Sequence, residues 1–135
     1  MKNYFKISDF NISGEPIPED VADKILVKHI EPMNLVAMHV PFEVKVSSKS
    51  GYRSYQWEKS KGRKGNSQHV FRGDGAVDWT CEDFENNKAE LLKAIIQLTD
   101  YSRIAEYNSF FHCDYAHQIE DRWLFNNRWQ RIRQI

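Results

Sequence analysis

The sequence has few cysteines, no excess charge of either sign and no long apolar run, and each absence excludes a class of protein. Two cysteines, Cys81 and Cys113, are too few for a disulfide framework, although they suffice for one bridge; we expect small buried thiols. Lys plus Arg and Asp plus Glu number 19 each, so no global field favours nucleic acid or an acidic membrane. No apolar run approaches the roughly 20 residues of a bilayer-spanning helix, so we expect no membrane span.

The composition is typical of a single globular domain over residues 1–135. Apolar types make up 41% and charged types 28% of the residues, which argues against disorder and against a fibre. The length of 135 residues leaves little room for a second domain. The first six residues lack the continuous apolar core of a secretory signal. We therefore expect the chain to be made, and to fold, in a cytoplasm.

Apolar periodicity predicts an α+β fold, with helices packed on one side of a mostly antiparallel sheet. A three-to-four-residue apolar spacing predicts helices over residues 19–33 and 83–98. Alternation of apolar and polar residues predicts strands over residues 41–47, 75–80, 102–107 and 109–115. Residues 8–10 are expected to close a short extended segment, residues 55–67 to form a basic, polar loop, and residues 123–135 show no clean period.

Three potential metal ligands, His69, Asp78 and His112, fall at the ends of predicted strands. Catalytic zinc usually takes three imidazole or carboxylate ligands and keeps a fourth position for water. Gly73 and Gly75 permit a tight backbone reversal between the first two of these residues. Spacing alone is a weak signal, because two histidines and an aspartate are more often surface or core residues. The other histidines, His29, His39 and His117, have no spacing that indicates a ligand.

Longer motifs surround these three residues and occur in a specific order along most of the chain. They are Ser50-Gly51-Tyr52-Arg53-Ser54, then Ser67-Gln68-His69 leading to Gly75-Ala76-Val77-Asp78, and then Phe111-His112-Cys113-Asp114. Together they resemble the zinc D-alanyl-D-alanine carboxypeptidase family, which includes the L-alanyl-D-glutamate endopeptidases of phages. The resemblance implies a hedgehog-type fold and a Zn²⁺ ion held by His69, Asp78 and His112.

The chain departs from the family pattern at two places. Eight residues separate His69 from Asp78 where the common form has six, which leaves Asp74 as an alternative ligand, although Ala76-Val77-Asp78-Trp79 fits the motif better. Many relatives carry a general-base carboxylate three residues before the last zinc histidine, and here that position is Ser109. Asp114 and Glu106 are the nearby carboxylates. Strand alternation places Asp114 on the same face as His112, as a base or as a partner that orients the imidazole.

The resemblance also implies roles for two further residues. Arg53 would hold a substrate carboxylate or the developing oxyanion, with a surface ion pair as the structural alternative. Ser67 would offer its hydroxyl to the substrate backbone, with a turn-stabilising hydrogen bond as the alternative. Four cations lie between Lys59 and Lys64, a run that is usually a solvated loop but is also found at sites for anionic polymers or nucleic-acid phosphates.

The function that this resemblance implies is zinc-dependent hydrolysis of peptidoglycan stem peptides near D-amino acids. A bare domain without a signal suits a phage lysin or a virion-associated lysis protein that acts at the bacterial cell wall. A host cytoplasmic D-alanyl-D-alanine dipeptidase is an alternative, although such enzymes usually carry a Glu where this chain has Ser109. The alternative is a structural or wall-binding virion module that has lost its chemistry, which Ser109 favours. Nucleic-acid binding is not expected, because the net charge is zero.

Overall fold

The computed structural model describes residues 5–11, 16–47, 50, 52–71 and 73–132 of the chain. The α+β prediction is confirmed: a six-stranded sheet is packed with helices. The strands are β1 (Val44–Val46), β2 (Ala76–Cys81), β3 (Arg103–Glu106), β4 (Phe111–Asp114), β5 (Trp123–Asn126) and β6 (Arg128–Arg131). Their order across the sheet is β1-β2-β4-β3-β5-β6, with β3 and β5 parallel and each other neighbouring pair antiparallel.

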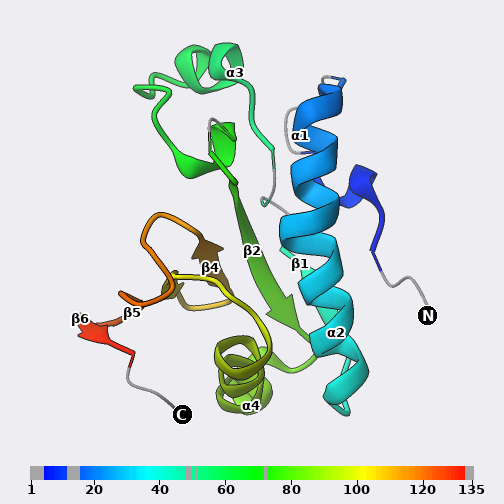
Figure 1. The fold of residues 1–135 in the computed structure, drawn as a ribbon, viewed down its shortest axis with the longest axis vertical. Helices are drawn as coiled ribbons and strands as arrows, with labels where there is room; N and C mark the ends of the chain where they lie inside the picture. Colours follow the sequence, from blue (N-terminus) through cyan, green and yellow to red (C-terminus); the bar gives the residue numbers. More distant parts are fainter. Residues whose placement is uncertain (1–4, 12–15, 48–49, 51, 72, 133–135) are drawn as a thin grey trace.

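The first helical region is longer than the sequence predicts. The helix α1 (Glu19–Lys24), the π-helical turn η2 (Ile25–Ile30) and the helix α2 (Glu31–His39) follow one another as one rod (Figure 1). Pro32 has no N–H to donate to the carbonyl of Lys28, four residues earlier, which usually breaks a helix. Here Pro32 lies in the first turn of α2, where a missing N–H is tolerated, and the hydroxyl of Tyr115 donates to the Lys28 carbonyl at 2.5 Å.

One face of the sheet carries the core, the rod that contains α2, and the helix α4 (Phe84–Leu98). Val77 and Trp79 of β2, Ile104 of β3 and Phe111 of β4 are fully buried. The helix α4 packs on this face, where the ring of Phe84 meets that of Phe111 at 5.2 Å between centroids. Because side chains alternate along a strand, Asp78 and His112 lie on the opposite face. The expected one-sided packing of helices therefore leaves the candidate metal ligands on the other side of the sheet.

Two local predictions are wrong. Residues 7–10 form a 3₁₀ turn, η1 (Ile7–Phe10), instead of an extended segment, because the backbone N–H of Lys6 donates to the carboxylate of Asp9 at 2.9 Å. Part of the expected loop over residues 55–67 is the helix α3 (Tyr55–Ser60). Its first turn is capped by Ser54, whose hydroxyl accepts the N–H of Trp57 at 3.0 Å.

Cys81 and Cys113 are free and buried, as expected for small core thiols. Within the described part of the chain, no helix has the length and apolar character required to cross a bilayer. Gly51, which belongs to one of the sequence motifs, and Arg72, in the loop before Asp78, lie outside the described residues.

Candidate metal centre

His69 is held by a short turn that two neighbouring residues stabilise. It lies in the 3₁₀ turn η3 (Gln68–Val70), and the hydroxyl of Ser67 accepts the His69 N–H at 3.2 Å. The backbone N–H of Arg53 donates to the His69 carbonyl at 3.0 Å. Ser67 thus stabilises this turn, and its hydroxyl also accepts from Nη2 of Arg53 at 3.3 Å.

Strand pairing places the other two candidate ligands side by side. Asp78 of β2 is directly opposite His112 of β4 in the antiparallel ladder. Directly opposite residues project from the same face of a sheet, with Cβ atoms roughly 5 Å apart. The backbone N–H of Asp78 donates to the hydroxyl of Ser50 at 2.5 Å. This bond connects β2 to the segment that leads to Arg53.

The three side chains converge as the sequence predicts. Oδ1 of Asp78 lies 3.5 Å from Nε2 of His69 and 3.1 Å from Nδ1 of His112. One potential ligand atom from each residue lies within 4.8 Å of the others. Zinc bonds of about 2.0–2.2 Å in a tetrahedral site place ligand atoms roughly 3.3–3.6 Å apart. The two distances from Oδ1 of Asp78 are close to this spacing, so the three residues form a group that can hold a zinc-type ion.

The charges of this cluster are strongly coupled. Burial alone would raise the pKa of Asp78, but hydrogen bonds from His112 and His69 outweigh it and lower the pKa to about 2. Burial would lower the pKa of His112, yet its bonds to Asp114 and Asp78 raise that pKa to about 9. In the metal-free protein at neutral pH, His112 is therefore an imidazolium between two carboxylates.

Asp114 holds the far side of the His112 ring. Its Oδ2 lies 2.7 Å from Nε2 of His112, while Nδ1 of the same ring faces Asp78. Asp114 is fully buried and accepts from Nε of Arg103 at 2.9 Å and from Nη2 at 2.6 Å. Hydrogen bonds from His112 and Arg103 outweigh burial and lower the pKa of Asp114. This geometry is that of a carboxylate that orients a ligand imidazole, with Arg103 orienting the carboxylate in turn.

The candidate ligands line a pocket of about 550 Å³. Its lining residues are Ser47, Arg53, Ser67, His69, Asp78, Tyr107, Ser109, Phe110 and His112. Arg53 and Ser67, which the sequence analysis selected, are therefore in the same pocket as the cluster. Among the described residues that line this pocket, Asp78 is the sole carboxylate. Asp114 lies behind His112 instead of in the pocket wall.

Arg53 is held in this pocket by a residue that the sequence analysis did not select. Glu58 of α3 is 2% exposed, and its Oε2 lies 3.7 Å from Nη1 of Arg53 and 3.2 Å from Nη1 of Arg63. Burial lowers the pKa of Arg53, and Glu58 opposes that shift. Nε of Arg53 is buried with no hydrogen-bond partner in the described part of the chain. In the sequence, Ser54 four positions before Glu58 is a residue type that often caps a helix, and this is the signal that could have drawn attention to Glu58.

Two alternative carboxylates lie elsewhere. Glu106 of β3 is directly opposite Phe111, on the helix-covered face of the sheet, and pairs with Lys88 of α4 at 3.4 Å. It therefore cannot act on a substrate bound beside His112. Asp74 pairs with Lys28 at 3.7 Å, outside the cluster, so Asp78 is the aspartate that the fold brings to the two histidines.

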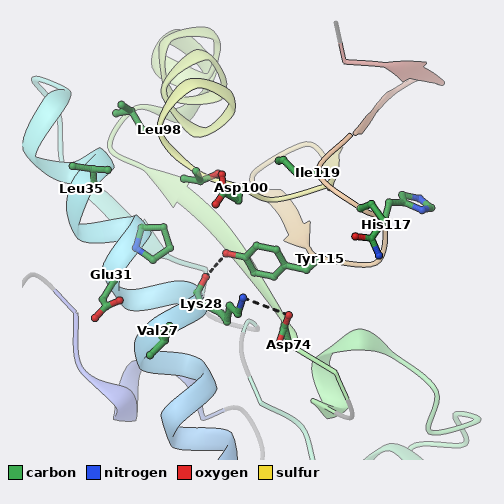
Figure 2. Close-up of a pocket in the computed structure, with 13 residues that line it drawn as sticks. Val27, Lys28, Glu31, Leu35, Asp74, Leu98, Asp100, Tyr115, His117 and Ile119 are labelled. Carbon is green, nitrogen blue, oxygen red and sulfur yellow. Dashed lines mark hydrogen bonds and ion pairs between the residues drawn. The ribbon is translucent and has the colours of Figure 1, made fainter. Parts of the chain in front are cut away.

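A second pocket, of about 650 Å³, lies between the η2–α2 rod and the segments around Asp100 and His117 (Figure 2). Asp74 and Lys28 form an ion pair there, and Tyr115 reaches the Lys28 carbonyl. None of the three candidate metal ligands lines it. We therefore place the site at the smaller pocket.

The basic run from Lys59 to Lys64 begins at the end of α3. Nζ of Lys61 and the guanidinium carbon of Arg63 lie 5.6 and 5.4 Å from the Trp57 ring centroid, and Arg63 also pairs with Glu58. The run thus packs partly on its own helix.

Comparisons with protein-family models, with curated proteins and with solved structures found no match to this chain.

Proposed function

We propose that the chain is a zinc-dependent peptidase that hydrolyses peptidoglycan stem peptides, of the D-alanyl-D-alanine carboxypeptidase or L-alanyl-D-glutamate endopeptidase type. The observation that carries the proposal is the convergence of His69, Asp78 and His112 in a pocket that also contains Arg53. The motif resemblance supports the choice of reaction, substrate and cofactor. A phage lysin or virion-associated lysis protein acting at the cell wall is the matching biological role.

His69, Asp78 and His112 would hold the ion through Nε2, Oδ1 and Nδ1. Zinc bound by three such ligands acts as a Lewis acid and lowers the pKa of water towards 7. Asp114 would keep the imidazole of His112 oriented, and Arg103 would keep Asp114 in place. These hydrogen bonds would hold the imidazole in place on the face of the sheet opposite α4.

Arg53 would bind the negative charge of the substrate. Arg53 lines the pocket, and its Nη1 forms an ion pair with Glu58. Its buried Nε has no hydrogen-bond partner in the described part of the chain. A planar guanidinium suits a carboxylate or an oxyanion because it can donate two parallel hydrogen bonds. Ser67, which already accepts from Arg53, lies beside it and would offer its hydroxyl to the substrate backbone.

A second candidate function is a wall-binding module without catalysis. The observation that favours it is the pocket lining, in which Ser109 stands where a general base is expected and Asp78 is the one carboxylate. General bases contribute about 10²–10⁴-fold to such reactions. A protein of this kind would bind zinc and cell wall without releasing products.

The test measures zinc content and turnover on the same preparations. Purified protein should contain one zinc ion per chain, measured by elemental mass spectrometry. It should also release new amino groups from purified peptidoglycan. His69→Ala and His112→Ala should lose both zinc and turnover. His39→Ala is the matched control, since the ring of that exposed histidine bonds to the Leu35 carbonyl outside the cluster. Zinc retained by both ligand variants would refute the metal site, and stoichiometric zinc without turnover would favour the module.

A further inference from the structure

The β5–β6 hairpin presents aromatic rings on the same face of the sheet as the candidate metal ligands. Strand register aligns one row across five strands: Asp78, His112, Ala105, Phe125 and Trp129. Directly opposite residues share a face, so Phe125 and Trp129 continue the side of the sheet on which the metal centre lies. Figure 1 shows this hairpin at the side of the sheet away from α1 and α2.

A parallel row runs beside the first, through Asp114, Arg103 and Trp123. A pocket of about 500 Å³ is lined by Arg103, His117, Trp123 and Trp129. Neighbouring strands lie about 4.8 Å apart, so β5 and β6 lie roughly 10 and 15 Å from β4. The pocket is thus about the length of a disaccharide away from His112. Arg103 lines this pocket and also donates to Asp114, the carboxylate that contacts His112.

The indoles of this pocket are held in position but not covered. Trp129 is 49% exposed, and its ring contacts that of Phe125 at 5.2 Å between centroids. Nε1 of Trp123 donates to Oδ1 of Asp121 at 2.8 Å, which sets the plane of its ring. A large exposed aromatic ring gives up the free energy that burial would provide, so rings fixed in this way are typical of binding surfaces.

The charges on the hairpin argue against a second copy of the chain as the occupant. β6 is an edge strand of the sheet, and an unpaired edge is where another strand could add. Arg128 and Arg131 are both exposed on it. An antiparallel partner with the same sequence would bring these like charges together, which disfavours pairing.

We propose that this pocket binds the glycan of the cell-wall polymer, as a subsite next to the metal centre. The C–H face of a pyranose ring is flat and apolar and stacks on an indole, here that of Trp129. Sugar hydroxyls would accept hydrogen bonds from Arg103 and His117. Arg103 uses Nε and Nη2 for Asp114, and its Nη1 takes no part in that contact. Figure 2 shows the imidazole of His117 turned away from Tyr115.

This inference rests on the proposed function, because stem peptides are attached to glycan strands. A glycan held on β5 and β6 would direct its peptide along the shared face towards His69 and His112. The subsite would therefore favour peptides still attached to sugar over free peptides. Binding of glycan itself needs neither the metal nor the ligand histidines.

The test uses soluble glycan strands from which all stem peptides have been removed, titrated into metal-free protein by calorimetry. Trp129→Ala should weaken binding about tenfold or more, the scale of one lost stacking contact. Trp129→Phe should retain much of the affinity because it keeps a ring. The control is Tyr55→Ala on α3, which removes a ring that is 42% exposed and should leave affinity unchanged. Thermal unfolding would verify that each variant is folded.

Several outcomes would overturn the subsite. Two of them are that the wild type binds no glycan, and that Trp129→Ala binds glycan as tightly as the wild type does. The remaining two are that the pocket binds single-stranded DNA in place of glycan, and that the wild type is a dimer which Trp129→Ala dissociates. The His69→Ala variant separates this proposal from the peptidase. It should bind glycan like the wild type even though it lacks zinc. Glycan binding in a protein without turnover would support the subsite and count against the peptidase alone.

Discussion

Nδ1 of His112 lies 3.1 Å from Oδ1 of Asp78, the residue directly opposite it where β2 pairs with β4. A metal ion at this site would bind both atoms. In the metal-free protein a proton on Nδ1 makes this contact, because a carboxylate can only accept. A metal ion must displace that proton in order to bind. The other nitrogen keeps its proton, since Nε2 faces the carboxylate of Asp114 at 2.7 Å.

Zinc affinity should therefore rise with pH. The pKa of His112 is raised to about 9, so at neutral pH the proton competes with zinc for Nδ1. We expect the apparent affinity to increase about tenfold per pH unit up to pH 9, with release of about one proton at pH 7. Competition with a zinc indicator and calorimetry in two buffers of different ionisation enthalpy measure these quantities. An affinity that stays constant from pH 6 to pH 8 would contradict the assignment of Nδ1 as the ligand atom.

The metal-free protein should lose stability over the same pH range. The folded-state pKa of His112, about 9, exceeds its ordinary value of 6.5, so its contribution is complete below pH 6.5 and disappears as the pH rises through 9. For Asp78, whose pKa is lowered from 3.8 to about 2, the contribution is present above pH 3.8 and disappears as the pH falls through 2. Denaturant unfolding between pH 6 and 9 measures how the free energy of unfolding falls as His112 loses its proton. His112→Gln should remove this pH dependence. An unchanged pH dependence in the variant would show that His112 does not cause it.

Asp114→Asn should weaken zinc binding about 10–100-fold, the usual effect of removing a carboxylate that orients a metal-binding imidazole. The amide carries no negative charge for either His112 or Arg103. Indicator competition on folded variant protein provides the measurement. If Asp114 were the general base, zinc affinity would be unchanged and turnover alone would fall by about 100-fold or more. Glu106→Gln is the control, because that carboxylate lies on the other face of the sheet and should affect neither quantity.

The sequence predicts the parts of the fold that depend on local pattern. Alternation along β2 and β4 places Asp78 and His112 on the face opposite the apolar side chains, and the structure agrees. The same alternation correctly places Asp114 beside His112. The short capped helix α3 was not predicted because its six residues are mostly polar and lack an apolar period.

Contacts between distant segments could not be predicted from pattern. Arg103 faces Asp114 because β3 pairs with β4 in a particular register, which no single strand determines. The hydroxyl of Tyr115 donates to the carbonyl of Lys28, four residues before Pro32. These two residues are 87 positions apart, so no local pattern indicates the contact. Aromatic residues such as Trp129 form a face only once β5 and β6 pair.

Tyr115→Phe should destabilise the protein by about 1–2 kcal/mol, since it leaves the carbonyl of Lys28 without the hydroxyl that replaces the missing N–H of Pro32. The ring and its stacking on Tyr101, at 4.7 Å between centroids, are retained. Denaturant unfolding at constant pH measures the loss. Tyr107→Phe is the control, because Tyr107 is 50% exposed and its hydroxyl can bond to water. Equal stability of the two variants would show that Lys28 finds another donor.

Gly75→Ala should destabilise the fold by about 1–3 kcal/mol and weaken zinc binding as well. Gly75 has a φ of +79°, and an added Cβ would collide with the ring of Phe71. That ring cannot withdraw freely, because it packs against His29 at 5.5 Å and Tyr52 at 6.2 Å between centroids. The strain falls in the loop that joins His69 to Asp78, so it should displace one of these candidate ligands relative to the other. Gly73→Ala in the same loop is the matched control, because its added Cβ meets nothing within 4 Å. Gly75→Ala and Gly73→Ala should differ in their free energy of unfolding and in their zinc affinity. Equal zinc affinity of the two variants would mean that this loop does not position the candidate ligands.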